Sequence, residues 1–227
     1  MLHGFGGTAR HWDRAGALLD RERYSPLALE LGAADPLALS GALELIGRLA
    51  PERFVLCGYS MGGRVALHAA LAMPQRVTRL VLLSSTAGIE DAAARASRRA
   101  DDEALAREIE RGSIEDFVAL WRTLPLFADD PEWVQEAVAD DARRLNPRLL
   151  AGTLRAYSAG VLEPLWGALP SLAMPAVVLA GERDLRYRAI GERLAQTLAD
   201  ATYHTVPGAG HRLALEAPDA VASAIGP

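Results

Sequence analysis

An apolar run joins a helical pattern through Gly-x-Ser-x-Gly in the stretch Phe54-Val55-Leu56-Cys57-Gly58-Tyr59-Ser60-Met61-Gly62-Gly63-Arg64-Val65-Ala66. A strand, a tight turn and a helix in this order are the setting of a nucleophile elbow. Such a turn holds a serine hydroxyl where a histidine reaches it, which serine needs in order to act as a nucleophile or a base. Gly58 and Gly62 supply the small residues that so tight a turn requires. Ser60 is therefore the first candidate catalytic residue.

The segments on either side of this stretch alternate between strand and helix patterns. Apolar strands are expected at 1–2, 27–31, 54–59 and 77–85, with helices after Thr8, at about 36–49 and at about 62–72. After a long interruption, strands at 175–180 and 201–206 alternate with helices at 187–198 and 218–225. This order predicts an α/β fold with a reduced, mostly parallel sheet that is flanked by helices on both faces.

The interruption between the two sets of strands is rich in charged residues and has helical spacing. Helices are expected at 92–111, 114–122, 131–145 and 149–159, and no convincing strand lies among them. We therefore expect an α/β core formed by residues 1–88 and 167–227, with a helical cap at 89–166 inserted between two strands of the sheet.

A serine at an elbow needs a histidine as its base and an acid that orients the histidine. His211 lies in Gly208-Ala209-Gly210-His211 after the last strand, and Asp184 lies in Gly181-Glu182-Arg183-Asp184 after the preceding one. Both loops leave the carboxyl ends of strands, where ligands bind in open α/β sheets. His211 and Asp184 are therefore the candidate base and acid. Glu182 is the alternative acid, although exposure or pairing with Arg183 is expected for it.

Stabilising a developing oxyanion requires two preorganised N–H donors. Met61 follows the elbow serine at the start of a helix, so its backbone N–H is one candidate. The glycine-rich turn His3-Gly4-Phe5-Gly6 offers the backbone N–H of Phe5 as the second. His3 is expected to support this turn rather than to act as a base.

Composition limits the partners and the compartment. A net charge of −5 over 227 residues gives no electrostatic case for nucleic acid or a membrane surface, and no segment has the ~20 apolar residues of a membrane span. All 24 basic residues are arginine, so an anion site must use guanidinium groups or backbone N–H groups. Cys57 is the only cysteine, which favours a cytoplasmic location. No His/Cys/Asp cluster has metal-ligand spacing, so no metal is expected.

The elbow, the His-Gly-Phe turn and the loops of Asp184 and His211 together resemble the α/β-hydrolase superfamily over nearly the whole chain. The order Ser…Asp…His is that of the superfamily. Within it, the stretch 58–66 resembles the family of 2-succinyl-6-hydroxy-2,4-cyclohexadiene-1-carboxylate synthases of the menaquinone pathway. Three features of the predicted cap strengthen this resemblance: arginines at 95, 98 and 99, Trp121 before Leu-Pro-Leu-Phe at 124–127, and Arg144 before Leu-Asn.

The resemblance implies a lyase without a metal or organic cofactor. In that family the serine, activated by the histidine, removes a proton from the substrate, and pyruvate is eliminated as a ring-conjugated product forms. Arg64 lies one helical turn beyond Ser60, where its guanidinium reaches a carboxylate near the serine. The expected partner is a small-molecule substrate that carries several carboxylates, and the expected substrate-binding residues are Tyr59, Arg64, Arg98, Trp121, Phe127 and Arg144.

Two other functions are compatible with the same residues. An esterase or carbon–carbon hydrolase would use Ser60 to form an acyl-enzyme. An inactive α/β-hydrolase would serve as a ligand-binding module. The sequence also departs from the superfamily in two places. It begins at the His-Gly-Phe turn, so a small sheet is expected, and residues 30–35 replace an Asp-x-Pro-Gly-x-Gly-like loop that helps to shape the site.

Overall fold

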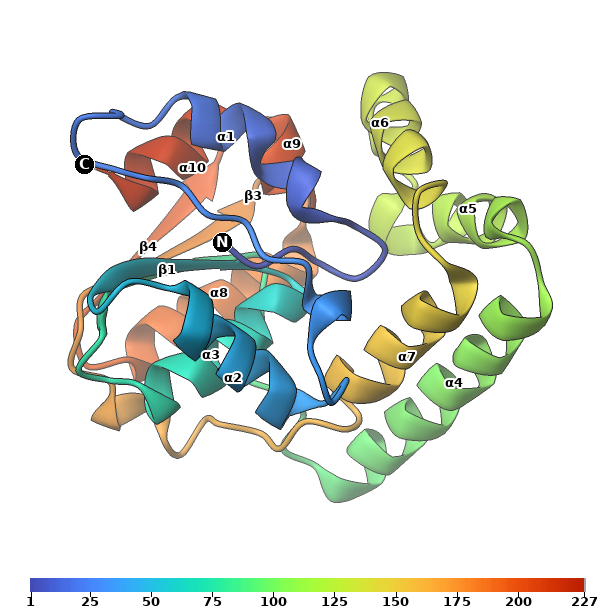
Figure 1. The fold of residues 1–227 in the computed structure, drawn as a ribbon, viewed down its shortest axis with the longest axis horizontal. Helices are drawn as coiled ribbons and strands as arrows, with labels where there is room; N and C mark the ends of the chain where they lie inside the picture. The colour runs from blue at the N-terminus through green and yellow to red at the C-terminus, as the bar shows by residue number, and fades with distance from the viewer. Residues whose placement is uncertain (227) are drawn as a thin grey trace.

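The computed structural model describes residues 1–226, and its centre is a parallel sheet of four strands (Figure 1). The strands follow one another across the sheet in chain order: β1 (Phe54–Tyr59), β2 (Val77–Leu83), β3 (Ala176–Gly181) and β4 (Ala201–Val206). Along β2, Leu80 and Leu82 belong to one hydrophobic cluster, whereas Val81 and Leu83 belong to another. Because alternate side chains of a strand point to opposite faces, the sheet is buried on both sides. The predicted α/β class with a reduced parallel sheet is confirmed.

Two of the predicted strands shrink to single bridges at the free edge of β1. Leu2 bridges both Leu29 and Gly58 in parallel, and the Leu2 N–H donates to the Cys57 carbonyl at 2.8 Å. The glycine-rich turn at 4–7 takes the chain away from the sheet after Leu2. After Leu29 the chain enters a short 3₁₀ turn, η2 (Leu31–Ala33). The full strand expected at 27–31 is therefore wrong, because pairing ends after one residue.

Helices cover both faces of the sheet (Figure 1). One face packs against α2 (Leu39–Leu49), α3 (Met61–Ala72) and α8 (Leu185–Thr197), and the other against α1 (Asp13–Ala17), α9 (Leu213–Glu216) and α10 (Pro218–Ile225). Short 3₁₀ turns η1 (Ala9–Trp12) and η4 (Leu169–Ser171) complete these layers. The helix expected from residue 36 begins instead at Leu39, because the backbone of Ala38 is extended.

Four helices between β2 and β3 lie to one side of these layers (Figure 1). They are α4 (Ala92–Arg111), α5 (Ile114–Thr123), α6 (Glu132–Ala142) and α7 (Pro147–Tyr157), with η3 (Pro125–Phe127) between α5 and α6. Side-chain caps fix several of their first turns, since Asp91, Ser113 and Asn146 each accept a backbone N–H. The helices share a small apolar cluster that includes Ala106 and Leu154.

These helices fall within the predicted cap, residues 89–166, which we call the cap segment. The division into core and cap segment stays a prediction. Residue 227, the last residue of the predicted core, lies outside the described residues. None of the helices in residues 1–226 is both long and apolar enough to cross a bilayer.

Candidate active site

The Gly-x-Ser-x-Gly stretch forms a sharp turn between β1 and α3. Ser60 adopts φ 51° and ψ −111°, a conformation that costs an L-residue strain and that the surrounding packing must impose. A Cβ at Gly58 would lie 2.5 Å from the Gly62 carbonyl oxygen, and one at Gly62 would lie 2.3 Å from the Leu2 carbonyl oxygen. Both contacts are with backbone, which has no room to yield. The two glycines therefore let the turn close and present the Ser60 side chain at the end of the sheet.

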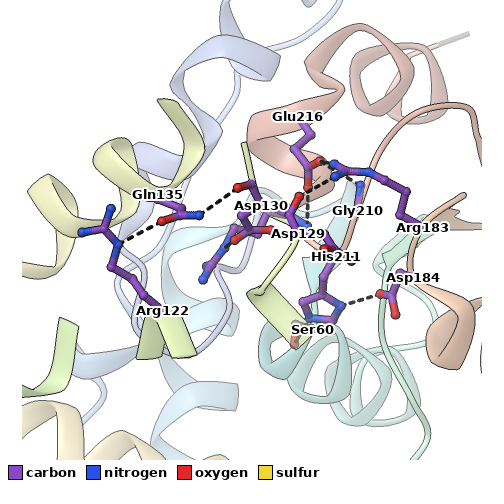
Figure 2. A network of polar contacts seen from close by, with 11 residues as sticks. Ser60, Arg122, Asp129, Asp130, Gln135, Arg183, Asp184, Gly210, His211 and Glu216 are labelled. Atoms are coloured by element: carbon purple, nitrogen blue, oxygen red, sulfur yellow. Dashed lines mark hydrogen bonds and ion pairs between the residues drawn. The ribbon is translucent and has the colours of Figure 1, made fainter. Parts of the chain in front are cut away.

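The three residues predicted to act together are brought into one hydrogen-bonded chain (Figure 2). His211 Nδ1 lies 2.6 Å from Asp184 Oδ2, and His211 Nε2 lies 3.1 Å from Ser60 Oγ. Asp184 follows β3 and His211 follows β4, so the chain of contacts crosses the carboxyl ends of three strands. Asp184 also accepts the Tyr187 N–H at the start of α8, which holds its carboxylate in place.

The surroundings of His211 favour a neutral ring. Burial lowers the pKa of His211 below its usual 6.5, and the hydrogen bond to Asp184 acts in the opposite direction. With Asp184 as a carboxylate, Nδ1–H donates to it, and Nε2 is left to accept the Ser60 hydroxyl proton. His211 is therefore arranged to act as a general base that accepts the Ser60 hydroxyl proton.

Phe5 and Met61, whose N–H groups are the predicted oxyanion donors, line the same cavity as Ser60. Met61 is the first residue of α3, and Phe5 lies in the turn that Gly7 closes by donating to the Gly4 carbonyl. Neither the Phe5 nor the Met61 N–H donates a hydrogen bond within residues 1–226. Two free backbone donors beside a serine hydroxyl are suited to a developing negative charge.

A cavity of about 640 Å³ lies between Ser60 and the cap segment. It brings together most of the residues singled out in the sequence: Phe5, Tyr59, Ser60, Met61, Arg64, Arg98, Trp121, Phe127 and His211. The aromatic rings form a connected wall, because Trp121 contacts Phe5 at 5.2 Å and Phe127 at 5.3 Å between centroids. The Phe127 ring also contacts His211 at 5.7 Å.

Arg64 is the most unusual of the polar residues in this cavity. Its side chain is buried, its Nη2 donates to the Tyr157 carbonyl at 3.3 Å, and its Nε has no partner. None of the ion pairs formed by residues 1–226 includes Arg64, and burial lowers its pKa. Arg98, by contrast, is half-exposed and pairs with Asp102 at 2.8 Å. Arg64 is therefore a buried cation with unused donors.

Arg144 is placed elsewhere. It is exposed and lines a separate cavity of about 400 Å³ with His3, Gly7 and Leu149. Arg144 lies in the loop between α6 and α7, and neither Ser60 nor Arg64 lines this second cavity, although Met61 lines both. The structure thus brings five of the six predicted substrate-binding residues to the Ser60 cavity and leaves Arg144 outside it.

Helix α8 contributes residues to the cavity that the sequence analysis missed. Arg186, Tyr187, Ile190 and Arg193 line it. Ile190 and Arg193 follow Arg186 at spacings of four and seven residues, which is the pattern of one helix face, and this signal was present in the sequence. Arg193 pairs with Glu90 at 2.7 Å and lies over the Trp166 ring at 3.8 Å.

Two further residues support loops rather than the chemistry. His3 Nδ1 lies 2.8 Å from the Gly4 carbonyl, and its Nε2 accepts the Leu31 N–H at 3.1 Å, so it holds the turn as expected. Glu182 is exposed and accepts the Gly208 N–H at 2.7 Å. Of the two expectations for Glu182, exposure is the one the structure shows, since Arg183 pairs with Glu216 instead.

Residues 1–224 match the model of the alpha/beta hydrolase family, and the chain belongs to that family. Within it, the chain is 31% identical to a protein of Salmonella agona named 2-succinyl-6-hydroxy-2,4-cyclohexadiene-1-carboxylate synthase, over 99% of this chain and 90% of that protein. The structure is similar to that of MenH from S. aureus, with a TM-score of 0.84, 26% identity, and 98% and 89% of the two chains covered. A thermophilic esterase from Thermogutta terrifontis shares the fold at 23% identity and a TM-score of 0.71, over 99% and 86% of the two chains.

Proposed function

We propose that the protein is a lyase of menaquinone biosynthesis that eliminates pyruvate from a succinyl-cyclohexene carboxylate. The similarity to proteins of that name supports the reaction. The observation that carries the proposal is the unpaired guanidinium of Arg64, buried in the cavity that also holds Ser60 and His211. A buried cation without a counter-ion is costly, and a substrate carboxylate would offset that cost.

In the proposed mechanism, Ser60, His211 and Asp184 act as a catalytic triad that removes a proton from carbon. His211 Nε2 takes the hydroxyl proton of Ser60 as Ser60 Oγ takes the proton of the substrate. The electron pair of the broken C–H bond moves into the ring, and the bond to the pyruvate unit breaks with its electron pair leaving on that unit. The proton held by His211 returns through Ser60, so the leaving pyruvate unit takes up the one proton that the ring lost.

The remaining residues of the cavity stabilise charge and hold the ring. The N–H groups of Phe5 and Met61 form the oxyanion hole for the enolate-like charge that develops on the substrate. Arg64 binds the carboxylate nearest to Ser60, and Arg98, which Asp102 holds at the cavity wall, binds another. Tyr59, Trp121 and Phe127 wall the ring. The substrate is thus a small molecule with several carboxylates, bound without a metal or organic cofactor.

The compartment is part of the same proposal. Cys57 is buried in the apolar strand β1, where burial raises the pKa of its thiol to about 12. As the only cysteine of the sequence, it has no partner for an internal disulfide, which suits the reducing cytoplasm in which we place the protein.

Pyruvate release from the succinyl-cyclohexene carboxylate precursor tests the proposal. The wild-type protein should release pyruvate, and Ser60→Ala should lower kcat by about 10³-fold or more, because the base and its activation are lost together. Thermal unfolding of both proteins checks that the variant is folded.

A serine hydrolase is the alternative that this experiment separates. The 3.1 Å contact between Ser60 and His211 would equally activate Ser60 as a nucleophile. No pyruvate from the wild type, with ester cleavage that depends on Ser60, would reject the lyase and retain the triad. Binding of the precursor without turnover of either substrate would reject both reactions.

A further inference from the structure

A buried carboxylate bridges the backbone on both sides of His211. Glu216, at the end of α9, accepts the Gly210 N–H through Oε2 at 2.8 Å and the Arg212 N–H through Oε1 at 3.0 Å. Its side chain is only 4% exposed. One side chain therefore fixes the two peptide groups that set where the His211 ring points, which a glycine-rich loop does not achieve alone.

Arg183 extends this contact to the loop of the acid (Figure 2). Its guanidinium pairs with Glu216, its Nε donates to the Gly208 carbonyl at 3.2 Å, and its backbone N–H donates to the Ala209 carbonyl at 2.9 Å. Arg183 directly precedes Asp184. The loops that carry Asp184 and His211 are thus tied by contacts additional to the hydrogen bond between the two side chains.

The same network reaches the cap segment. Arg183 Nη1 donates to the Asp129 carbonyl, and Arg212 Nε donates to Asp130 in a pair of which both side chains are buried. Gln135 of α6 then donates to the Asp130 carbonyl at 2.9 Å and accepts from Arg122 of α5 at 3.1 Å (Figure 2). The Arg212 guanidinium also lies 3.9 Å from the centroid of Phe127, the ring that contacts His211.

We propose that Glu216 is a positioning residue for His211, and that Arg183 and Arg212 make docking of cap residues 129–130 part of the same positioning. Arg183 contacts both the His211 loop and the cap segment, and Arg212, which directly follows His211, pairs with the cap segment. An undocked cap segment would remove a partner from both arginines, and Arg183 would then hold Glu216 less firmly. The inference uses His211 as the base, as the proposed function does, but it holds for elimination and for hydrolysis alike.

The reactivity of Ser60 towards a fluorophosphonate tests this without any assumption about the substrate. In Glu216→Gln, the amide cannot accept both N–H groups as a carboxylate does and no longer pairs with Arg183. Because a misplacement of about 1 Å costs up to about 100-fold, we expect the labelling rate and kcat to fall at least about tenfold, with KM little changed. The downfield NMR signal of the His211 Nδ1 proton should weaken in the same variant.

Asp130→Asn tests the connection to the cap segment. We expect a smaller fall in the labelling rate than in Glu216→Gln. The labelling rate of the double variant Glu216→Gln/Asp130→Asn should stay within about twofold of that of Glu216→Gln, because both changes break one network. Glu103→Gln removes a carboxylate that pairs with Arg107 and Arg155, and none of the three residues lines the cavity. It is the matched control and should leave the labelling rate unchanged.

Three results would overturn the proposal. A folded Glu216→Gln protein with wild-type labelling rate, kcat and NMR signal would show that Glu216 does not position His211. If the fold-losses of the two single variants multiply in the double variant, the cap segment is not coupled to the position of His211. An equal loss in Glu103→Gln would show a general effect on folding. Failure of the proposed function gives a different pattern, with no pyruvate from the wild type but the same ranking of labelling rates.

Discussion

The elbow helix α3 and the cap helix α4 line the same cavity in different ways. Nine of the twelve residues of α3 are buried, whereas only Asp102, Ala106 and Ile109 are buried among the twenty of α4. The elbow places Ser60 and Met61 through a backbone that the sheet encloses. The cap helix places Arg98 through a long side chain held by one ion pair.

In the proposed function, this difference separates the reacting groups from the groups that select a substrate. Groups that must stay aligned within a fraction of an ångström come from enclosed backbone at strand ends. The groups proposed to bind carboxylates are arginines, whose reach and direction depend on how separate helices pack. Arg64 has features of both sets of groups, because it is an arginine but lies on the buried helix α3.

The largest effect should come from filling the space at the elbow. A Cβ in Gly62→Ala would meet two backbone carbonyl oxygens, those of Leu2 at 2.3 Å and His3 at 2.5 Å. We expect the free energy of unfolding to fall by about 3 kcal/mol and activity to be lost. Gly167→Ala is the control, because a Cβ there meets nothing within 4 Å. Equal denaturation midpoints for the two variants would contradict the enclosed elbow.

Arg64 and Arg144 should differ sharply although both were predicted from the sequence to bind substrate. Arg64→Ala should lower kcat/KM for pyruvate release by about 100-fold, since a buried charge-assisted contact is lost, and should leave cleavage of a small neutral ester largely unchanged. Arg144→Ala should change pyruvate release by less than about twofold, because Arg144 lies in another cavity. Steady-state kinetics with both substrates measures this difference. A loss of kcat/KM in Arg144→Ala equal to that in Arg64→Ala would show that Arg144 also binds the substrate.

A smaller effect concerns pH. Because burial lowers the pKa of His211, the neutral base persists below pH 6.5, and activity is lost only as pH falls through the lowered value. The acidic limb of kcat/KM should therefore have its midpoint below 6.5. The same sign applies to stability: protonation of His211 opposes folding, so its contribution is present above 6.5 and is lost as pH falls below it. NMR titration of the His211 ring measures this pKa directly, and a value above 6.5 would contradict the expectation.

Much of the fold followed from local patterns. The bounds of α4, β4 and α10 match the predicted 92–111, 201–206 and 218–225, because Asp91 caps α4, Pro218 opens α10, and residues with high strand propensity such as Thr, Tyr and Val mark β4. The strand at 27–31 failed, because a strand also depends on a partner, and Leu2 offers pairing at one residue only. Pairing partners are not a local property of the sequence.

The sequence by itself determined which residues come together at the sheet edge: a strand–turn–helix around Ser60, with an acid and a histidine after later strands, permits few other arrangements. That is so because parallel strands bring their carboxyl ends to one edge. Only the tertiary structure decided that Arg64 and Arg98 share a cavity while Arg144 does not, and that Glu216 bridges the backbone around His211. The direction of a long side chain depends on the packing of distant helices, which no local pattern encodes.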